Sequence, residues 1–410
     1  MLTHTLSQQS AHYLHLEEEF GAHNYHPLPV VLEKGEGVFV WDVDGKRYYD
    51  FLSGYSAINQ GHCHPRIINK LVQQASKLTL TSRAFHNNLL GEYSQYITSL
   101  FGYDKVLPMN TGVEAVETAI KLSRRWGYAV KGIAENMARI VVCEHNFHGR
   151  TSTVISFSSD PTAYTNFGPF MPGFDFVPFN DLVALEQKFQ DNNIAAFLLE
   201  PIQGEAGVVV PDAGYLKGVR DLCTEYNVLL IADEIQTGLA RTGKMLAIDH
   251  EDVHADILIL GKALSGGTVP VSAVLANNDI MMLIKPGEHG STYGGNPLAC
   301  AVAMESLQVL LDENMAENAA AMGELFRNEL IKLESPLIKT VRGRGLLNAI
   351  VVNHANPDAA WNLCMELKDN GLLAKPTHGD KIRFAPPLVI TKDQVHECVQ
   401  IISHSLKVLS

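Results

Sequence analysis

The pattern that most constrains the fold is an alternation of helical stretches with short apolar runs between about residues 65 and 275. Short, continuous runs rich in aliphatic and β-branched residues, placed between helices, are typical of parallel strands buried on both faces. The apolar runs are 139–143, 195–199, 228–232 and 257–260, and the helical stretches are 66–78, 87–101, 112–130, 181–191 and 214–226. We therefore predict an α/β fold, with a mostly parallel central sheet in a large domain.

The segments on either side of this region follow other patterns. Residues 1–24 are polar and helical in character, and Pro27 and Pro29 then favour an extended chain. Asp44-Gly45 between two strand-like runs, 38–42 and 48–51, is a strong hairpin signal. Further along we predict helices at 297–313, 315–333, 356–370 and 391–408, and strands at 346–352 and 382–385. We expect an N-terminal segment (1–48) packed with a smaller α+β domain (299–410), and a large domain (49–298) between them.

Charge and cysteine content exclude some classes of function. The formal net charge is −13 and there is no basic run, which argues against a nucleic-acid-binding surface. The N-terminus lacks the basic and apolar regions of a secretory signal, and no apolar run has the length of a membrane span. The six cysteines are scattered, with no metal-ligand spacing. We expect a cytoplasmic protein without a structural metal.

Charged and aromatic side chains follow four of the predicted strands. Ligands of an open α/β sheet bind beyond the carboxyl ends of its strands. Asp233 follows the run 228–232, and Lys262 follows 257–260 after one glycine. The other two strand ends lead to Glu144–Arg150 and to Glu200–Glu205. The sequence therefore predicts one edge of the sheet that carries the chemistry.

Lys262 and Asp233 together indicate a pyridoxal phosphate site. Alone, Lys262 could be a solvated lysine at a strand end. An amine with an ordinary pKa of about 10.4 is a poor nucleophile at neutral pH, but it becomes useful when desolvated or held as a Schiff base. Pyridoxal phosphate requires such a lysine together with an acid that pairs with its ring nitrogen. A buried carboxylate at Asp233 would keep that nitrogen protonated.

Two polar, glycine-containing turns are candidates for a phosphate site. Phosphate binds well to the free N–H groups at a helix N-terminus. Asn110 or Thr111 can cap the helix that follows, and Gly112 permits a close approach of the ligand. The turn 291–297 also precedes a helix. Any capped helix has a similar sequence, so neither turn decides the matter alone.

Several spaced motifs resemble one family. The stretches 230–238, 241–243 and 261–262 resemble the signature of the class III (ω-) aminotransferases of pyridoxal phosphate fold type I. Gly61–Pro65, Phe147–Arg150 and the turn 291–297 are similar to the same family, and the spacing extends over essentially the whole chain.

The resemblance implies pyridoxal 5′-phosphate as cofactor. Lys262 would hold it as a Schiff base and act as the general base, and Asp233 would pair with the pyridine nitrogen. Thr292 would reach the phosphate of the partner subunit, which implies a homodimer with shared active sites. Further cofactor contacts are implied for Gly112, Val113, Phe147, Gln236 and Ser291.

Within the family, several stretches are similar to members that transfer the δ-amino group of L-ornithine to 2-oxoglutarate. They are 24–30, 54–62, 342–350 and 375–379, and Arg344 stands where lysine is expected. Relatives that act on acetylornithine or 4-aminobutyrate typically carry an aliphatic residue at the position of Tyr55. The resemblance therefore implies L-ornithine and 2-oxoglutarate as substrates, and L-glutamate 5-semialdehyde and L-glutamate as products.

The same resemblance implies roles for the substrate-binding residues. Arg150 would bind a carboxylate in both half-reactions, with the bidentate geometry that suits a guanidinium. Tyr25 and Tyr55 would position the α-amino and α-carboxylate groups of ornithine. Arg383 would bind the α-carboxylate of 2-oxoglutarate, and Glu205 would mask Arg383 while ornithine is bound.

Other interpretations remain open from the sequence. The chain could be an ω-aminotransferase for acetylornithine, 4-aminobutyrate or lysine, a pyridoxal phosphate aminomutase or decarboxylase, or a non-catalytic protein that keeps the fold. Arg150 could be a structural ion-pair partner and Tyr25 a core aromatic. We expect structural roles for His148, Glu234 and Arg241, to which no catalytic task is assigned.

Overall fold

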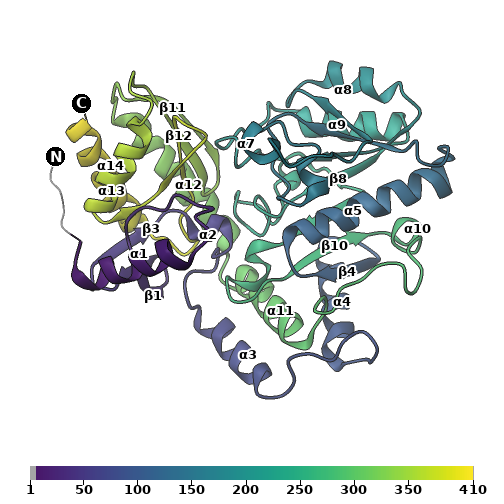
Figure 1. The fold of residues 1–410 in the computed structure, drawn as a ribbon, viewed down its shortest axis with the longest axis horizontal. Helices are drawn as coiled ribbons and strands as arrows, with labels where there is room; N and C mark the ends of the chain where they lie inside the picture. The colour runs from purple at the N-terminus through teal and green to yellow at the C-terminus, as the bar shows by residue number, and fades with distance from the viewer. Residues whose placement is uncertain (1–5, 410) are drawn as a thin grey trace.

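The computed structural model describes residues 6–409, so the first five residues of the predicted N-terminal helix lie outside the described part. Within that part, the strands form one seven-stranded and two four-stranded sheets. Figure 1 shows the large sheet and its helices on one side, and the N- and C-terminal segments together on the other. Between residues 6 and 409, no helix has both the length and the apolar character needed to cross a bilayer.

The central sheet has the order β4-β10-β9-β8-β7-β5-β6. Its strands are β4 (Lys105–Met109), β5 (Arg139–Cys143), β6 (Phe174–Val177), β7 (Ile194–Leu199), β8 (Leu229–Asp233), β9 (Ile257–Leu260) and β10 (Ser272–Ala276). Strands β6, β5, β7, β8 and β9 run parallel, whereas β10 is antiparallel to both of its neighbours. The predicted mostly parallel sheet is confirmed. The sequence patterns did not predict β4, β6 or β10.

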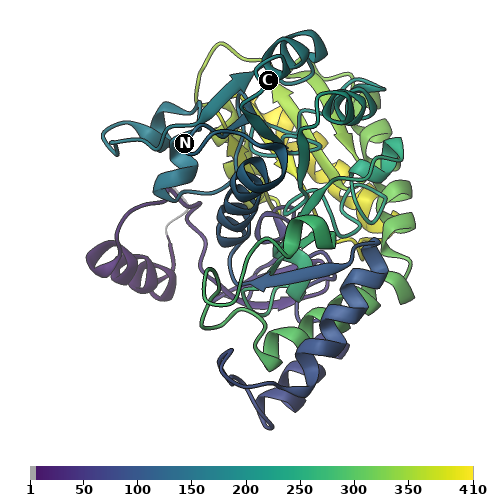
Figure 2. The ribbon, with the colours of Figure 1, turned by 90° about the vertical axis from the view of Figure 1, so that its right-hand side faces the viewer.

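Both faces of the central sheet are buried. Alternate residues of a strand enter different apolar clusters: Ile140 and Val142 of β5 belong to one, and Val141 and Cys143 to the other. Helix α5 (Gly112–Trp126), continued by a π-helical turn, η1 (Gly127–Lys131), covers one face. Helices α8 (Leu182–Phe189) and α9 (Tyr215–Glu225) pack on the other cluster (Figure 2). This two-sided burial explains why the predicted strands are continuous apolar runs.

The C-terminal elements build a smaller α+β unit that is joined to the N-terminal segment. The sheet β11-β12-β15-β14 is antiparallel, and the sheet β1-β2-β3-β13 pairs β13 in parallel with β3. Elements from opposite ends of the chain therefore lie side by side (Figure 1). The strands are β1 (Leu32–Glu36), β2 (Phe39–Asp42), β3 (Arg47–Asp50), β11 (Ile338–Arg344), β12 (Leu347–Val352), β13 (Leu372–Leu373), β14 (Lys375–Thr377) and β15 (Lys381–Phe384). The helices are α1 (Gln8–Phe20), α12 (Met315–Lys332), α13 (Ala359–Asp369) and α14 (Lys392–Leu409).

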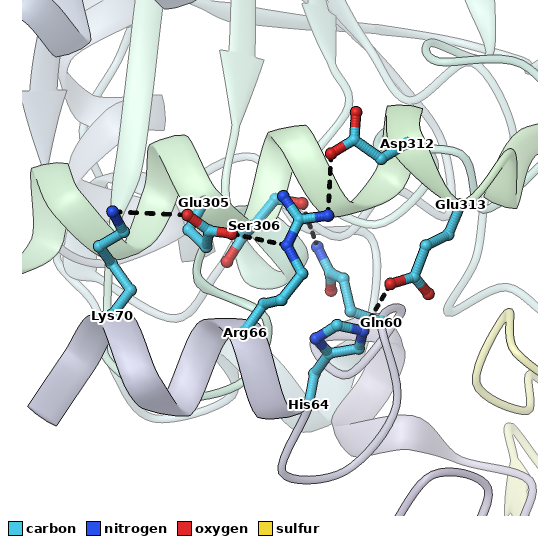
Figure 3. A network of polar contacts seen from close by, with 8 residues as sticks. All are labelled: Gln60, His64, Arg66, Lys70, Glu305, Ser306, Asp312 and Glu313. Atoms are coloured by element: carbon cyan, nitrogen blue, oxygen red, sulfur yellow. Dashed lines mark hydrogen bonds and ion pairs between the residues drawn. The ribbon is translucent and has the colours of Figure 1, made fainter.

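Helices α3 (Pro65–Ala75), α4 (Asn88–Phe101) and α11 (Pro297–Asp312) pack together below the sheet (Figure 1). Figure 3 shows the polar contacts between α3 and α11: Arg66 binds Glu305 and Asp312, each at 2.8 Å. His64, at the start of α3, binds Glu313 at 3.0 Å. The remaining short helices are α2 (Ser53–Ser56), α6 (Ser152–Ile155), α7 (Pro161–Tyr164), η2 (Ile248–Glu251), η3 (Lys262–Ser265) and α10 (Asn278–Met281).

Candidate active site

A cavity of about 200 Å³ lies where several strands of the central sheet end. Because β7, β8 and β9 are parallel, their carboxyl ends meet at this edge and deliver Glu200, Asp233 and Lys262 to one place. The cavity is lined by Gly112, Val113, Phe147, His148, Gly149, Glu200, Glu205, Asp233, Ile235, Gln236, Thr237 and Lys262. Most of the cofactor residues expected from the sequence are therefore close together.

Lys262 is held at the first position of the 3₁₀ turn η3, which begins directly after β9 and Gly261. Its φ of 44° is unusual for a residue with a side chain, and such strain is maintained only where the surroundings fix the backbone. Gln60 does so in part, because its side-chain amide donates to the carbonyls of Ala263 (3.0 Å) and Ser306 (3.2 Å; Figure 3). Burial lowers the pKa of Lys262 to about 8, against partial opposition from the Glu205 carboxylate.

Asp233 is paired with a buried histidine. The carboxylate is 4% exposed, and its Oδ2 lies 2.6 Å from Nδ1 of His148, while its Oδ1 accepts from the Ile235 N–H at 3.1 Å. Burial alone would lower the pKa of His148, yet the hydrogen bond and charge of Asp233 outweigh it and raise that pKa. The two side chains form a hydrogen-bonded pair, and both line the cavity. The sequence reasoning did not predict this pairing.

Glu200 is a second buried acid that the sequence reasoning left without a task. It comes directly after β7, and Asp233 is the last residue of β8, so this similar placement at a strand end was the available signal. Its Oε2 accepts from the Phe147 N–H at 2.9 Å, which fixes the backbone that carries the Phe147 ring. Burial raises the pKa of Glu200 to about 7, with the nearby Asp233 carboxylate adding to the effect.

The N-terminus of α5 provides the polar end of the cavity. Thr111 caps the helix in a capping box with Glu114, and Gly112 and Val113, the first two residues of the helix, line the cavity. A Cβ at position 112 would lie 2.9 Å from the Ile235 side chain, which explains the glycine. Ser291 joins this end through its hydroxyl, which accepts from the Asn110 side-chain amide at 2.6 Å. Thr292 is exposed on the surface of this chain.

Glu205, Arg383 and Gln236 form one hydrogen-bonded group beside Lys262. Arg383 is 2% exposed, and its Nη1 donates to Oε1 of Glu205 at 2.5 Å. The Gln236 amide donates to the same oxygen at 3.1 Å and accepts from Arg383 at 3.4 Å. A Cβ at Gly204 would overlap the Gln236 side chain, so the glycine makes room for it. Although burial opposes ionisation, the charges of Arg383 and Lys262 lower the pKa of Glu205 to about 2.

The two tyrosines and Arg150 lie at the mouth of the site. The Arg383 guanidinium stands 5.3 Å from the centre of the Tyr55 ring, within the range of a cation–π contact. Burial raises the pKa of Tyr55, and the charges of Glu205 and the nearby Tyr25 add to the effect. Tyr25 is 64% exposed, so it is not a core aromatic. Arg150 lies 5.6 Å from the Phe147 ring centre and lines an adjoining cavity of about 780 Å³.

The chemistry of this donor set suits pyridoxal phosphate. It combines a desolvated amine, a buried carboxylate with a histidine behind it, an aromatic ring and a helix N-terminus around one cavity. A phosphate suits the helix N-terminus, and a protonated ring nitrogen suits Asp233. In addition, the buried Nε of Arg383 has no hydrogen-bond partner among the described residues, so this guanidinium has a donor left for a ligand.

Comparison with known proteins gives a consistent result. The model of the family Aminotransferase class-III matches residues 20–406. An ornithine aminotransferase described as mitochondrial from Rattus norvegicus is 64% identical over 390 residues, which is 95% of this chain and 89% of the relative.

Two solved structures are similar throughout. The ornithine aminotransferase from Toxoplasma gondii, described with partial occupancy of PLP at its active site, is 50% identical, with a TM-score of 0.96 over 98% of this chain and 94% of that one. An acetylornithine aminotransferase from Elizabethkingia anophelis is 61% identical, with a TM-score of 0.90 over 97% and 99%. With a family model that matches residues 20–406 and relatives that share its sequence and fold over nearly the whole chain, the chain belongs to the class III aminotransferases.

Proposed function

We propose that the chain is an ornithine δ-aminotransferase (EC 2.6.1.13), which transfers the δ-amino group of L-ornithine to 2-oxoglutarate with pyridoxal 5′-phosphate as cofactor. The products are L-glutamate and L-glutamate 5-semialdehyde, which cyclises to pyrroline-5-carboxylate. The observation that carries the proposal is the Glu205–Arg383 ion pair, buried between Lys262 and Tyr55. Its support comes from relatives described as ornithine aminotransferases at 54–64% identity over nearly the whole chain.

Each proposed cofactor residue would contact a different part of the cofactor. When bound, the cofactor supplies an aldehyde that condenses with an amine and a ring that withdraws electrons. Lys262 would hold the cofactor and would serve as the base that moves a proton during the reaction. Asp233, hydrogen-bonded to His148, would keep the ring nitrogen protonated. Gly112 and Val113 would hold the phosphate together with Ser291, Phe147 would contact the ring, and Gln236 would hydrogen-bond the ring hydroxyl.

The first half-reaction requires that the δ-amine of ornithine meets Lys262 while its charged α-carbon end stays away. Arg383 alone would attract the ornithine carboxylate toward the cofactor. Glu205 cancels that attraction, because its carboxylate is ionised and already bound to Arg383. Tyr25 and Tyr55 then hold the α-amino and α-carboxylate groups at the mouth of the site. Orientation of this kind contributes about 7–11 kcal/mol at most to a reaction.

The second half-reaction requires two cationic groups. 2-Oxoglutarate brings a carboxylate at each end, and Arg383 and Arg150 provide one guanidinium for each. Arg383 becomes available when Glu205 turns away, and its unpartnered Nε already offers a donor. Gln236 contacts both members of the pair, so it can follow Glu205 in this change.

The Elizabethkingia relative favours a second candidate, acetylornithine as the amino donor. The test is a single-turnover measurement on purified holoenzyme, in which L-ornithine, N²-acetyl-L-ornithine and 4-aminobutyrate are each mixed with the enzyme without 2-oxoglutarate. We expect L-ornithine to bleach the cofactor absorbance fastest, and 2-oxoglutarate to restore it. Faster bleaching by either other amine would overturn the substrate assignment. Loss of carbon dioxide would indicate a decarboxylase, and repeated turnover without 2-oxoglutarate, beyond one equivalent of product per site, would indicate an aminomutase.

We also propose a homodimer in which Thr292 of one subunit reaches the phosphate bound by the other. The exposure of Thr292 in the single chain supports this assignment. Sedimentation should give twice the chain mass, and Thr292→Ala should weaken cofactor binding without unfolding the protein. The domain boundaries 1–48, 49–298 and 299–410 and a cytoplasmic location stay proposals, and cell fractionation tests the location.

A further inference from the structure

Arg241 is a buried cation to which the proposed reaction gives no task. It follows Gln236 by five residues, in the turn between β8 and η2, and it is 0% exposed. Burial lowers its pKa to about 9, and the Asp50 carboxylate opposes this only in part. Taking a guanidinium out of water is costly unless its donors are satisfied. The fold therefore keeps this side chain at a cost in stability.

The four hydrogen bonds of the Arg241 guanidinium all go to uncharged oxygens. Nε and Nη2 donate to Oδ1 of Asn59 at 3.1 and 2.6 Å, and Nη1 donates to the carbonyls of Leu346 (3.0 Å) and Pro386 (2.6 Å). A carboxylate side chain could move together with the guanidinium. Two of these three acceptors are instead main-chain carbonyls, whose positions are fixed by the backbone. Only the planar, forked group of arginine reaches three acceptors in this arrangement.

The acceptors belong to segments that carry substrate-binding residues. Asn59 follows Tyr55 by four residues, and Pro386 follows Arg383 by three. Asn59 adds two bonds of its own: its amide donates to the Leu239 carbonyl at 2.7 Å, and its main-chain carbonyl accepts from Leu388 at 2.8 Å. Arg241 and Asn59 therefore join the backbones that carry Tyr55, Gln236 and Arg383.

We propose that Arg241 and Asn59 are positioning residues that hold Arg383 against Glu205 and Gln236, and through this placement set the choice of the δ-amine over the α-amine. This inference rests on the proposed ornithine δ-aminotransferase function. Arg383 reaches Glu205, Gln236 and the Tyr55 ring from a strand of the smaller unit, whereas Gln236 comes from the large sheet. A small shift between the two units would separate these groups, and misplacement by about 1 Å can cost on the order of a hundredfold in rate.

The test compares three variants of the holoenzyme, each assayed below its melting temperature. Arg241→Lys keeps a positive charge but loses the planar guanidinium that reaches three acceptors at once. Asn59→Ala removes the shared acceptor. Asn59→Asp keeps the acceptor oxygen and adds a charge opposite Arg241, but it replaces the bond to Leu239 with a repulsive contact between two oxygens. For Arg241→Lys and Asn59→Ala we expect KM for 2-oxoglutarate to rise on the order of tenfold, with a matching fall in the δ-to-α product ratio from L-ornithine. Asn59→Asp should keep the wild-type ratio even if its melting temperature falls.

Arg327→Lys is the matched control. Arg327 is half-buried and donates to a carbonyl (Gly345, 2.8 Å) and an amide oxygen (Asn348, 2.7 Å), but both lie within the smaller unit. It should lose stability with an unchanged product ratio. The inference is overturned if Arg241→Lys and Asn59→Ala, like the control, lose stability without a change in the product ratio. It is also overturned if Asn59→Asp loses as much selectivity as Asn59→Ala. If Arg241→Lys does not fold, the two Asn59 variants decide. Failure of the wild-type enzyme to use L-ornithine would instead overturn the proposed function, and the inference with it.

Discussion

Arg383 donates a hydrogen bond to Glu205 at 2.5 Å, and Glu205 lines the same cavity as Lys262; the Arg383 side chain is 2% exposed and that of Glu205 19%. A buried ion pair of this kind is weak evidence for stability, because the cost of desolvation offsets the attraction of the charges. Its placement in the cavity indicates instead a role in selecting between substrates that differ in charge.

Replacing Glu205 with Ala should redirect the enzyme toward the α-amine of ornithine. Without the carboxylate, Arg383 is free to bind the substrate α-carboxylate, which brings the α-carbon to Lys262. We expect the δ-to-α product ratio from ornithine to fall on the order of tenfold, with little change in kcat/KM when glutamate is the amino donor. Chromatography of the products measures the ratio, and Glu144→Ala, on the outer side of the site, is the control. Unchanged products would exclude the masking role.

The selectivity of the wild-type enzyme should not depend on pH between about 5 and 9. The pKa of Glu205 is lowered to about 2 in the folded protein, against an ordinary value of 4.5. The contribution of a lowered carboxyl pKa is fully present above the unfolded value and is lost as pH falls through the folded value. The ion pair therefore persists down to about pH 4.5 and weakens toward pH 2. A product ratio that changes between pH 6 and 8 would contradict this.

Capture of the cofactor by the apoprotein should become faster as pH rises, and level off above about pH 8. Burial lowers the pKa of Lys262 to about 8, and only the neutral amine attacks an aldehyde. At pH 7 about a tenth of this amine is neutral, against about one part in 2,500 for an unperturbed lysine. Stopped-flow absorbance measures the rate. Lys262→Ala should show no such phase, and its turnover should fall on the order of ten-thousandfold. A rate still rising at pH 10 would contradict a lowered pKa.

Asp233→Asn and His148→Gln should differ in severity. Asparagine cannot hold the ring nitrogen protonated, so we expect kcat to fall by at least about a hundredfold. His148 acts through Asp233, by a bond of 2.6 Å between buried atoms, and its replacement should mainly weaken cofactor affinity. Equilibrium binding and kcat, measured for both variants, separate the two effects. Equal losses of kcat would assign His148 a direct part in the chemistry.

Tyr55→Ile should reduce the preference for L-ornithine over N²-acetyl-L-ornithine. The ring is half-buried and contacts the Arg383 guanidinium at 5.3 Å, so its loss removes both a hydroxyl and a cation–π contact near the ornithine α-groups. We expect KM for L-ornithine to rise about tenfold or more. Tyr55→Phe keeps the ring and tests the hydroxyl alone. An unchanged ratio of kcat/KM for the two amines would remove Tyr55 from the specificity site.

Much of the fold could be predicted because the signals are local. A continuous apolar run between two helices is suited to a strand covered on both sides, and β5, β7, β8 and β9 lie where this pattern predicts them. β10 was missed because its sequence, Ser-Ala-Val-Leu-Ala, is short and dominated by small residues. β4 was missed because it begins with a lysine and contains Pro108, which weakens the strand signal at an edge of the sheet.

The sequence by itself determined which residues stand at the ends of parallel strands, and therefore that Lys262 and Asp233 approach one cavity. Only the tertiary structure decided which side chains pair there. His148 and Asp233 are 85 residues apart, Glu205 and Arg383 are 178 apart, and Arg241 and Asn59 are 182 apart. Strand and helix periodicity records which face of an element is buried but not which distant element covers it. These pairings are therefore set by how distant elements pack, within the large unit for His148 and Asp233 and between the two units for Glu205 and Arg383.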